Sequence, residues 1–452
     1  MNVEMWQWVL LIAINIALFI ISPWSTKLQD FFQGSNNDRA PNVWFLTSSL
    51  VICWLFAKSV TNAIDLGYSH GMPGGVAYAG YYLSFMVAGI IIYRMRTIGN
   101  YISIHHFLHK KYGLLAVRIF SILISIRLLN EIWSNTMIVG SYFGTVGSTS
   151  YYSAILVFTV FTLAYTMKGG MRSSILTDVI QMVLFGFLLF LILWIIIPKT
   201  EGGVYQLVNT GTWAMSNGLN LFFVAILQIF SYPWHDPIMT DRGFISTPKK
   251  TLTAFILATL IGIICILLIS LVGIFGSKQN LPFPIAMEVA RGLGIPMMII
   301  MNLIMVTSAA STIDSTFTSS VKLIHVDILK SKNLNISNAR WSMILIALAG
   351  TIPVFFNPEI LSATTVSGTM VLGLAPIFVF WQWNAPRISY YLSVSVGIIA
   401  GFLFVFFPIP SSWLFTDGKY ADLLFINIIA TILCFVSFTV PYLIIKHGTK
   451  HT

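Results

Sequence analysis

Long apolar runs separated by short polar segments follow one another along the whole chain. A helix that rises about 1.5 Å per residue needs about 20 residues to cross a hydrocarbon core of about 30 Å, and by this rule we count about thirteen spans. The pattern predicts an all-α integral membrane protein without a separate soluble domain. The predicted spans are residues 5–22, 43–66, 73–95, 115–143, 151–167, 173–197, 218–236, 251–275, 296–327, 339–356, 360–383, 388–408 and 421–445.

Composition supports a membrane protein. Of the 452 residues, 57% are hydrophobic and only 9% are charged, a balance far from that of soluble domains. Cys53, Cys265 and Cys434 all fall within spans, where we expect packing residues rather than disulfides. The first span has no Lys or Arg before it and no small-residue cleavage site after it, so we expect it to persist as a helix.

The net charge of +10 could indicate a nucleic-acid partner, but the distribution of basic residues argues against one. Cytoplasmic loops of membrane proteins collect Lys and Arg. With the N-terminus outside, nearly all loop cations, Arg242 among them, fall on the inner side. We therefore predict a multi-pass protein of the plasma membrane, embedded in the lipid bilayer, with a cytoplasmic C-terminus and no nucleic-acid partner. The outer side would hold only Lys199, Lys278, Arg291 and Lys419.

Two sets of five spans have opposite directions in this topology. The first set covers residues 42–197 and the second covers residues 218–383. Residues 1–41 add an N-terminal helix and a cytoplasmic loop, and residues 384–452 add two helices and a short tail. This order predicts a 5+5 inverted repeat.

Each set begins with an interrupted span. Residues 56–67 (FAKSVTNAIDLG) are polar in mid-span, and residues 231–237 (SYPWHDP) contain two prolines that remove helix hydrogen bonds. Inverted repeats whose first helices are broken at the same depth are typical of transporters, because the unpaired backbone groups bind ions and polar solutes. The alternative is that the prolines only kink a packed helix.

A stripe of hydroxyl side chains marks the ninth span. Its members are three or four residues apart and share one helix face: Ser308, Ser311, Thr312 and Ser315. Such a stripe could serve only close helix packing. Asp314, at the edge of this face, favours a binding role, because a carboxylate at that depth is costly and usually has a partner or a cation.

A second acid, Asp178, lies in GGMRSSILTDVIQ (169–181), and both acids are expected in the inner half of the membrane. Two carboxylates about 5 Å apart repel by about 3 kcal/mol at an effective dielectric constant of about 20. They therefore need a bound cation, a proton or a neighbouring base. Lys58 could be that base, and the alternative is that Lys58 pairs structurally with Asp65.

Three segments together resemble the sodium:solute symporters, the family of sodium-coupled sugar, proline and sialic acid carriers. Residues 169–181 match its Gly-Gly and Thr-Asp-x-x-Gln element, residues 308–328 match its serine-rich helix, and residues 241–250 (DRGFISTPKK) match its Arg-containing loop after the second broken helix. The resemblance extends over residues 42–408. It implies a LeuT-type fold with a bundle that moves against a scaffold, and a symporter, not an enzyme, that imports a small organic solute by alternating access.

The resemblance also implies sodium as the coupling ion, with no other cofactor. The implied ligands of a principal sodium site are the carbonyls of Ala57, Val60 and Ser308 and the side chains of Ser311 and Thr312. Those of a second cation site are Asp178, Ser311, Asp314 and Ser315. Position 314 is commonly a hydroxyl residue in members that use two sodium ions. The acid at this position therefore leaves proton coupling open as an alternative.

Polar and aromatic groups near the two breaks are candidates for solute binding. Acids beside Trp and Tyr suit an amino or quaternary ammonium group. The position that matches the sugar carriers' asparagine is Ile229, which disfavours a hexose. We therefore predict a small polar organic solute, a zwitterion or an organic cation. The candidate residues are Ser59, Asn62, Asp65, Glu131, Trp133, Asn135, Tyr232, Trp234 and His235.

Two other classes of protein compete with a carrier. HHFLH (105–109) is similar to the histidine clusters of membrane metal enzymes, but no second cluster accompanies it, and an interfacial helix explains it better. A solute sensor that acts with a separate signalling partner would bind solute without moving it.

Overall fold

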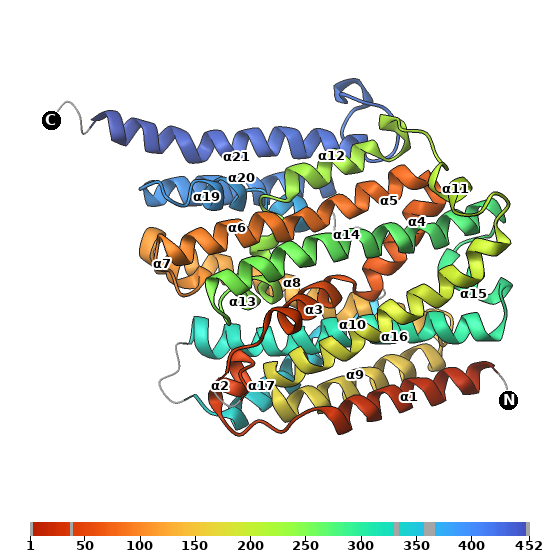
Figure 1. The fold of residues 1–452 in the computed structure, drawn as a ribbon. Coiled ribbons are helices and arrows are strands. Elements are labelled where there is room, and N and C mark those ends of the chain that lie inside the picture. Colours follow the sequence, from red (N-terminus) through yellow and green to blue (C-terminus); the bar gives the residue numbers. More distant parts are fainter. Residues whose placement is uncertain (1–2, 37–38, 330–333, 357–366, 449–452) are drawn as a thin grey trace.

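The structure, a computed structural model, describes residues 3–36, 39–329, 334–356 and 367–448. These residues form helices and contain no strand beyond one isolated bridge between Asn36 and Arg39, so the all-α prediction is confirmed. The long helices run side by side. Helix α1 (Val3–Ile21) begins and helix α21 (Ala421–Gly448) ends at opposite ends of the molecule (Figure 1).

The helices are grouped here by the two predicted sets of spans. The first set contains α3 (Val43–Trp54), α4 (Ala57–His70), α5 (Met72–Ala79), α6 (Leu83–Thr97), α8 (Leu114–Ser141), α9 (Thr149–Gly169) and α10 (Met171–Ile196). The second set contains α12 (Leu219–Gln228), α13 (Pro237–Arg242), α14 (Pro248–Lys278), α16 (Ile295–Lys322), α17 (Ile336–Thr351) and α19 (Leu374–Val379). Helix α20 (Arg387–Phe406) packs on α21, and the connecting helices are α2 (Leu28–Gln33), α7 (Ile104–Tyr112), α11 (Gly203–Val208) and α15 (Ile285–Gly292).

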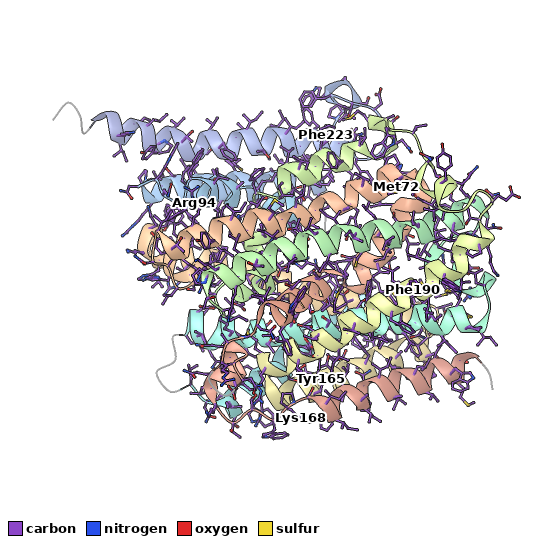
Figure 2. All side chains as sticks on the ribbon, in the orientation of Figure 1. Met72, Arg94, Tyr165, Lys168, Phe190 and Phe223 are labelled. Atoms are coloured by element: carbon purple, nitrogen blue, oxygen red, sulfur yellow. The ribbon has the colours of Figure 1, made fainter. Side chains whose placement is uncertain are left out.

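Among the described residues, nine helices are long and apolar enough to cross a membrane, and the bent pair α3–α4 could add a tenth. The count of thirteen stays a prediction, because α8 carries three charged residues and the predicted span 360–383 begins within residues 357–366, which lie outside the described ones. Side chains such as Phe190 and Phe223 project from the helices and are 57% and 45% exposed (Figure 2). A lipid-facing surface accounts for such exposed apolar groups.

The first broken helix bends by 61° between α3 and α4. Phe56 has an extended backbone (φ −68°, ψ 161°) and precedes the first residue of α4, Ala57. The polar stretch 56–67, predicted as the interruption, therefore folds as a helix from Ala57 onward, and the chain breaks at its start. The polar side chains of α4 do not interrupt its backbone hydrogen bonds, since several of them face a cavity.

The second broken helix is interrupted where the sequence predicts it. Helix α12 ends at Gln228, a 3₁₀ turn covers Tyr232–His235, and α13 begins at Pro237. A proline has no N–H to donate, and the first turn of a helix is where none is needed. Asp236 caps α13, because its Oδ1 accepts the N–H groups of Ile238 (3.0 Å) and Met239 (3.2 Å).

The helices pack as two groups. The first, which we call the bundle, contains α3–α6 and α12–α14; the second, which we call the scaffold, contains α8–α10, α16 and α17. Within the bundle, α4 and α14 approach so closely that a Cβ on Gly273 would lie 1.8 Å from the Ile64 carbonyl oxygen. The two groups meet most extensively where α3 lies against α10. The polar residues of the candidate site lie at this junction.

Candidate ion and solute sites

Unpaired carbonyls lie at the end of α3. The last hydrogen bond of this helix runs from the Leu55 N–H to the Val51 carbonyl (2.9 Å), so the carbonyls that follow have no helical N–H donor. Thr312 Oγ1 on α16 donates to the Cys53 carbonyl (3.3 Å), and the Tyr82 hydroxyl donates to the Trp54 carbonyl (2.7 Å). The first break therefore faces the serine-rich helix, as the resemblance implies.

The carbonyls predicted for the principal sodium site lie elsewhere. Ala57 and Val60 belong to the first turn of α4, after the break, and the Ala57 carbonyl accepts a hydrogen bond from Thr61 Oγ1 (3.0 Å). The two residues therefore lie beyond the break, and their carbonyls are not those left without a helical donor at the end of α3. The carbonyls that the break leaves without a helical partner include those of Ile52 and Leu55, on the side of α3.

The hydroxyl side chains of α16 do gather at this place. The Ser308 carbonyl accepts a hydrogen bond from Thr312 Oγ1 (3.1 Å), and Ser311 Oγ donates to Asp178 Oδ1 (2.6 Å). All three residues of α16 are buried. The predicted residues Ser308, Ser311 and Thr312 therefore lie beside the first break.

Asp178 and Asp314 are both fully buried, and hydroxyl groups surround them. Asp178 accepts hydrogen bonds from Ser311 and from Ser49 on α3 (2.5 Å). Asp314 accepts from three scaffold hydroxyls at 2.7–2.9 Å, those of Tyr165, Ser174 and Thr177. This arrangement connects α3, α9, α10 and α16 through oxygen atoms.

Arg242 supplies the positive charge of this cluster. Its Nη2 lies 3.5 Å from Asp178 Oδ2 and donates to Ser315 Oγ (2.7 Å), while its Nε donates to Ser49 Oγ (2.8 Å). The side chain is fully buried, which corrects its assignment to the cytoplasmic loop cations. Sequence reasoning missed this role, because α13 ends at Arg242 and only the fold turns the side chain inward.

Lys58 does not neutralise the two aspartates. Its Nζ lies 3.1 Å from Glu131 Oε1 and 3.4 Å from Ser134 Oγ on α8, and it does not pair with Asp65 either. Both interpretations of Lys58 drawn from the sequence are therefore wrong. Asn135 donates to the other Glu131 oxygen (2.8 Å), so this predicted solute residue also belongs to a buried charge network.

The same network joins the two broken helices. Arg127 forms an ion pair with Glu131, and its Nη2 lies 3.8 Å from Asp236 Oδ2 at the second break. Trp54, the last residue of α3, donates its indole N–H to the same Asp236 oxygen (2.9 Å). Two cations and two carboxylates thus lie together in the buried interior, where an unpaired charge would be costly. Arg127 and Asp236 are far apart in the chain, so no local pattern indicated that they would meet.

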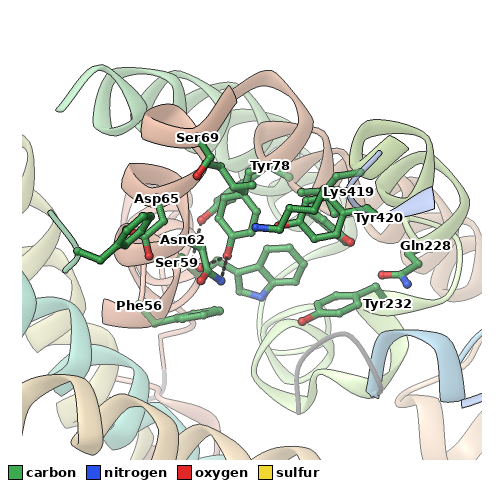
Figure 3. Close-up of a pocket in the computed structure, with 16 residues that line it drawn as sticks. Phe56, Ser59, Asn62, Asp65, Ser69, Tyr78, Gln228, Tyr232, Lys419 and Tyr420 are labelled. Carbon is green, nitrogen blue, oxygen red and sulfur yellow. Dashed lines mark hydrogen bonds between the residues drawn. The ribbon is translucent and has the colours of Figure 1, made fainter. Parts of the chain in front are cut away.

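A cavity of about 260 Å³ opens above the breaks (Figure 3). Aromatic side chains form most of its wall, and two charged residues, Asp65 and Lys419, complete it. Asn62 donates to the Tyr78 hydroxyl (3.4 Å), which donates to Ser59 Oγ (3.0 Å). The lining residues are Trp54, Phe56, Ser59, Asn62, Asp65, Leu66, Ser69, Tyr78, Tyr81, Tyr82, Leu221, Gln228, Tyr232, Phe283, Lys419 and Tyr420.

The cavity contains four of the predicted solute residues, Ser59, Asn62, Asp65 and Tyr232. It does not contain the other five. Glu131 and Asn135 belong to the charge network, and Trp133 packs in a separate apolar cluster. Trp234 stacks on Phe378 with ring centroids 4.1 Å apart, and His235 Nδ1 lies 2.5 Å from the Tyr232 carbonyl oxygen. The turn at the second break directs these two rings into the packed interior.

Sequence reasoning missed most of the aromatic wall. Tyr78, Tyr81 and Tyr82 have helical spacing and share one face, but such a face is more often part of a packed core than of a binding cavity. Tyr420 and Lys419 come from the connection between α20 and α21, and only the fold brings them over α4. Gln228 at the end of α12 likewise carried no local signal.

No family model and no curated protein match this chain. Among solved structures, the chain is similar to a substrate-bound, outward-open Na⁺-coupled sialic acid symporter, with 16% identity, 98% of each chain covered and a TM-score of 0.73. It is also similar to Mhp1, a nucleobase-cation-symport-1 family transporter in a closed, bromovinylhydantoin-bound conformation, with 11% identity, 90% and 95% of the two chains covered and a TM-score of 0.56. These similarities confirm the LeuT-type fold.

Proposed function

We propose that this chain is a sodium-coupled symporter that imports a small organic solute by alternating access. One observation carries the proposal: carbonyls without a helical N–H partner lie at the first break, where a hydroxyl of α16 reaches one of them, and a cavity opens beside the same break. Broken helices that meet at mid-membrane are where transporters bind ions and solutes together. A Na⁺-coupled sialic acid symporter and the nucleobase-cation-symport-1 family transporter Mhp1 share this fold.

Sodium is a hard cation and favours oxygen ligands, by analogy with calcium and magnesium. The proposed site keeps the Ser308 carbonyl and the hydroxyls of Ser311 and Thr312. It replaces the carbonyls of Ala57 and Val60 with those of Ile52 and Leu55. The hydrogen bond between Thr312 and the Cys53 carbonyl supports this choice, because it brings α16 directly to the end of α3.

The cavity supports a solute with an ammonium group. Asp65 is half-buried in its wall and forms no ion pair in the part of the chain that the structure describes. Tyrosine and tryptophan faces around it attract organic cations. Lys419 lies across the cavity and would suit a carboxylate on the same solute, so a small zwitterion fits this lining best (Figure 3).

The described conformation supports access from the outside. The cavity extends from the breaks to Lys419 and Phe283, in connections that the charge distribution places outside. At the predicted inner ends of α13 and α16, Asp241 and Lys322 form an ion pair that joins bundle and scaffold. In this mechanism sodium stabilises the state that accepts solute, and by reciprocity solute raises the affinity for sodium by the same factor.

A transport assay tests the proposal. Thermal shifts of the purified chain with glycine betaine, proline and choline, each in sodium, in potassium and at low pH, identify a ligand. Uptake of that ligand into proteoliposomes is then driven by an imposed sodium or proton gradient. Accumulation with the sodium gradient supports the proposal, and accumulation only with the proton gradient supports proton coupling. Binding without flux supports a sensor.

An Asp65 variant tests the solute site in the same assays. Asp65→Asn removes the negative charge from the cavity wall and should weaken binding of a cationic solute about tenfold, which corresponds to about 1.4 kcal/mol. Ser69→Ala, at another lining position, is the matched control and should bind normally. Unchanged binding to Asp65→Asn would exclude this residue as the anchor of the solute.

A further inference from the structure

Arg242 occupies the place that the resemblance assigns to a second cation. Three implied ligands of that ion, Asp178, Asp314 and Ser315, surround the end of its side chain or lie next to it. Arg242 Nη2 lies 2.7 Å from Ser315 Oγ and 3.5 Å from Asp178 Oδ2. The same nitrogen lies 3.4 Å from Ser174 Oγ, which in turn donates to Asp314 Oδ1 at 2.7 Å.

The oxygen atoms around Arg242 contact one another directly. Ser174 Oγ lies 2.8 Å from Ser315 Oγ, and both Asp178 oxygens accept hydroxyl hydrogen bonds at 2.5–2.6 Å. Both Asp314 oxygens are also engaged by hydroxyl donors. A metal ion would need these oxygens to move apart, whereas the guanidinium is bonded at the edge of the cluster, where its several N–H groups reach different oxygens.

The first site has a different environment. Lys58, four residues beyond Trp54 in the chain, extends its Nζ to Glu131 and Ser134 on α8 rather than to the Cys53 carbonyl or Thr312. Arg242 also contacts the hydroxyl of Ser49 rather than that of Thr312. The break carbonyls and the hydroxyl face of α16 are therefore not bridged by either of these cations.

We propose that Arg242 is a tethered cation that takes the place of a second sodium ion, so that the carrier uses one sodium per cycle. Arg242 lies at the end of α13 in the bundle, and its partners Asp178 and Ser315 lie in the scaffold. A guanidinium at this position links the two groups as a bound ion would, yet it moves with the bundle and is not released. This proposal depends on the proposed function only because it takes from it that sodium binds at the first site.

Equilibrium binding of radioactive sodium to the purified full-length chain tests this assignment. We expect one sodium per wild-type chain, bound at the first site and bound about tenfold more weakly in Thr312→Ala. Arg242→Gln keeps a hydrogen-bonding side chain but removes the charge, which leaves Asp178 and Asp314 without their cation, and we expect this variant to bind one additional sodium. Arg242→Lys, which keeps a tethered charge, is the control and should bind no additional ion.

Each outcome decides the proposal. Two sodium ions in the wild type, one of them lost in Asp314→Asn, would overturn it, and so would a folded Arg242→Gln that gains no ion. If Arg242→Gln does not fold, the comparison of the wild type with Asp314→Asn still decides. A wild type that binds no sodium would remove the proposed sodium coupling, whereas a single ion gained by Arg242→Gln would still support the role of Arg242.

Discussion

Thr312 is the residue that joins the hydroxyl face of α16 to the first break. Its Oγ1 lies 3.3 Å from the Cys53 carbonyl and 3.1 Å from the Ser308 carbonyl. The first contact crosses from α16 to α3 and the second lies within α16; Thr312→Ala removes both, whereas Thr312→Ser keeps the oxygen and removes only a methyl group. Its effect on ion binding can therefore be separated from its effect on folding.

We expect Thr312→Ala, which removes one oxygen ligand, to weaken sodium binding about tenfold. A tenfold change in the dissociation constant corresponds to about 1.4 kcal/mol. Thr312→Ser keeps the hydroxyl and should retain most of the affinity. The measurement is the sodium concentration that gives half of the thermal stabilisation of the purified chain. Equal sodium dependence in Thr312→Ala and the wild type would contradict the proposed site.

Glu131 is the acid that holds two buried cations, Lys58 and Arg127. Glu131→Gln leaves these cations with only Asp236 nearby, and loss of one partner of a buried ion pair costs about 3–5 kcal/mol. We expect a large decrease in thermal stability in detergent. The double variant Lys58→Met, Glu131→Gln should recover part of it, because the uncompensated charge is then gone. A single variant as stable as the wild type would show that the network does not support the fold.

The two breaks define the site, and the sequence predicts the second break better than the first. Prolines 233 and 237 mark the second break, because a missing N–H is a local property. The first break has no proline or glycine, and the end of α3 at Leu55 depends on its tertiary contacts. The polar residues of α4 were interpreted as an interruption, whereas they line a cavity, and Ala57 and Val60 lie in the first turn of α4 rather than at the end of α3.

The crossing of α4 and α14 depends on a residue without a side chain. A Cβ at Gly273 would lie 1.8 Å from the Ile64 carbonyl oxygen, so Gly273→Ala must push two bundle helices apart. Overpacking of this kind costs about 1–3 kcal/mol. We expect lower thermal stability and little transport, as measured by melting in detergent and by uptake. Gly186→Ala on α10 has nothing within 4 Å of the new atom and is the matched control.

At the scale of the whole molecule, hydropathy and the repeat of broken helices predicted an all-α membrane protein with an inverted repeat, and the resemblance of three segments to a known family implied the LeuT-type fold. These signals extend over whole helices, and only helices and closed barrels can span a membrane. The partners of buried charges were not predictable in the same way. Lys58, Arg127 and Arg242 each reach across to another helix, and the choice among possible acids depends on packing that no local pattern encodes.

The orientation in the membrane remains a prediction, and cysteine labelling in intact cells tests it. The three native cysteines are buried, so background labelling should be low. An impermeant maleimide should label Lys278→Cys from outside and label Lys249→Cys only after the cells are permeabilised. Labelling of Lys249→Cys in intact cells would reverse the predicted topology.

Trp54 belongs both to the cavity and to the surroundings of the proposed ion position. Its ring lines the cavity, its backbone oxygen is held by Tyr82 beside the proposed ion position, and its indole nitrogen reaches Asp236. A ligand that pushes against Trp54 or Tyr82 therefore perturbs the ion's surroundings through a single amino acid. Coupling between the solute and the ion then needs no chain of intermediate side chains. Binding of the solute and binding of the ion should both change the tryptophan fluorescence.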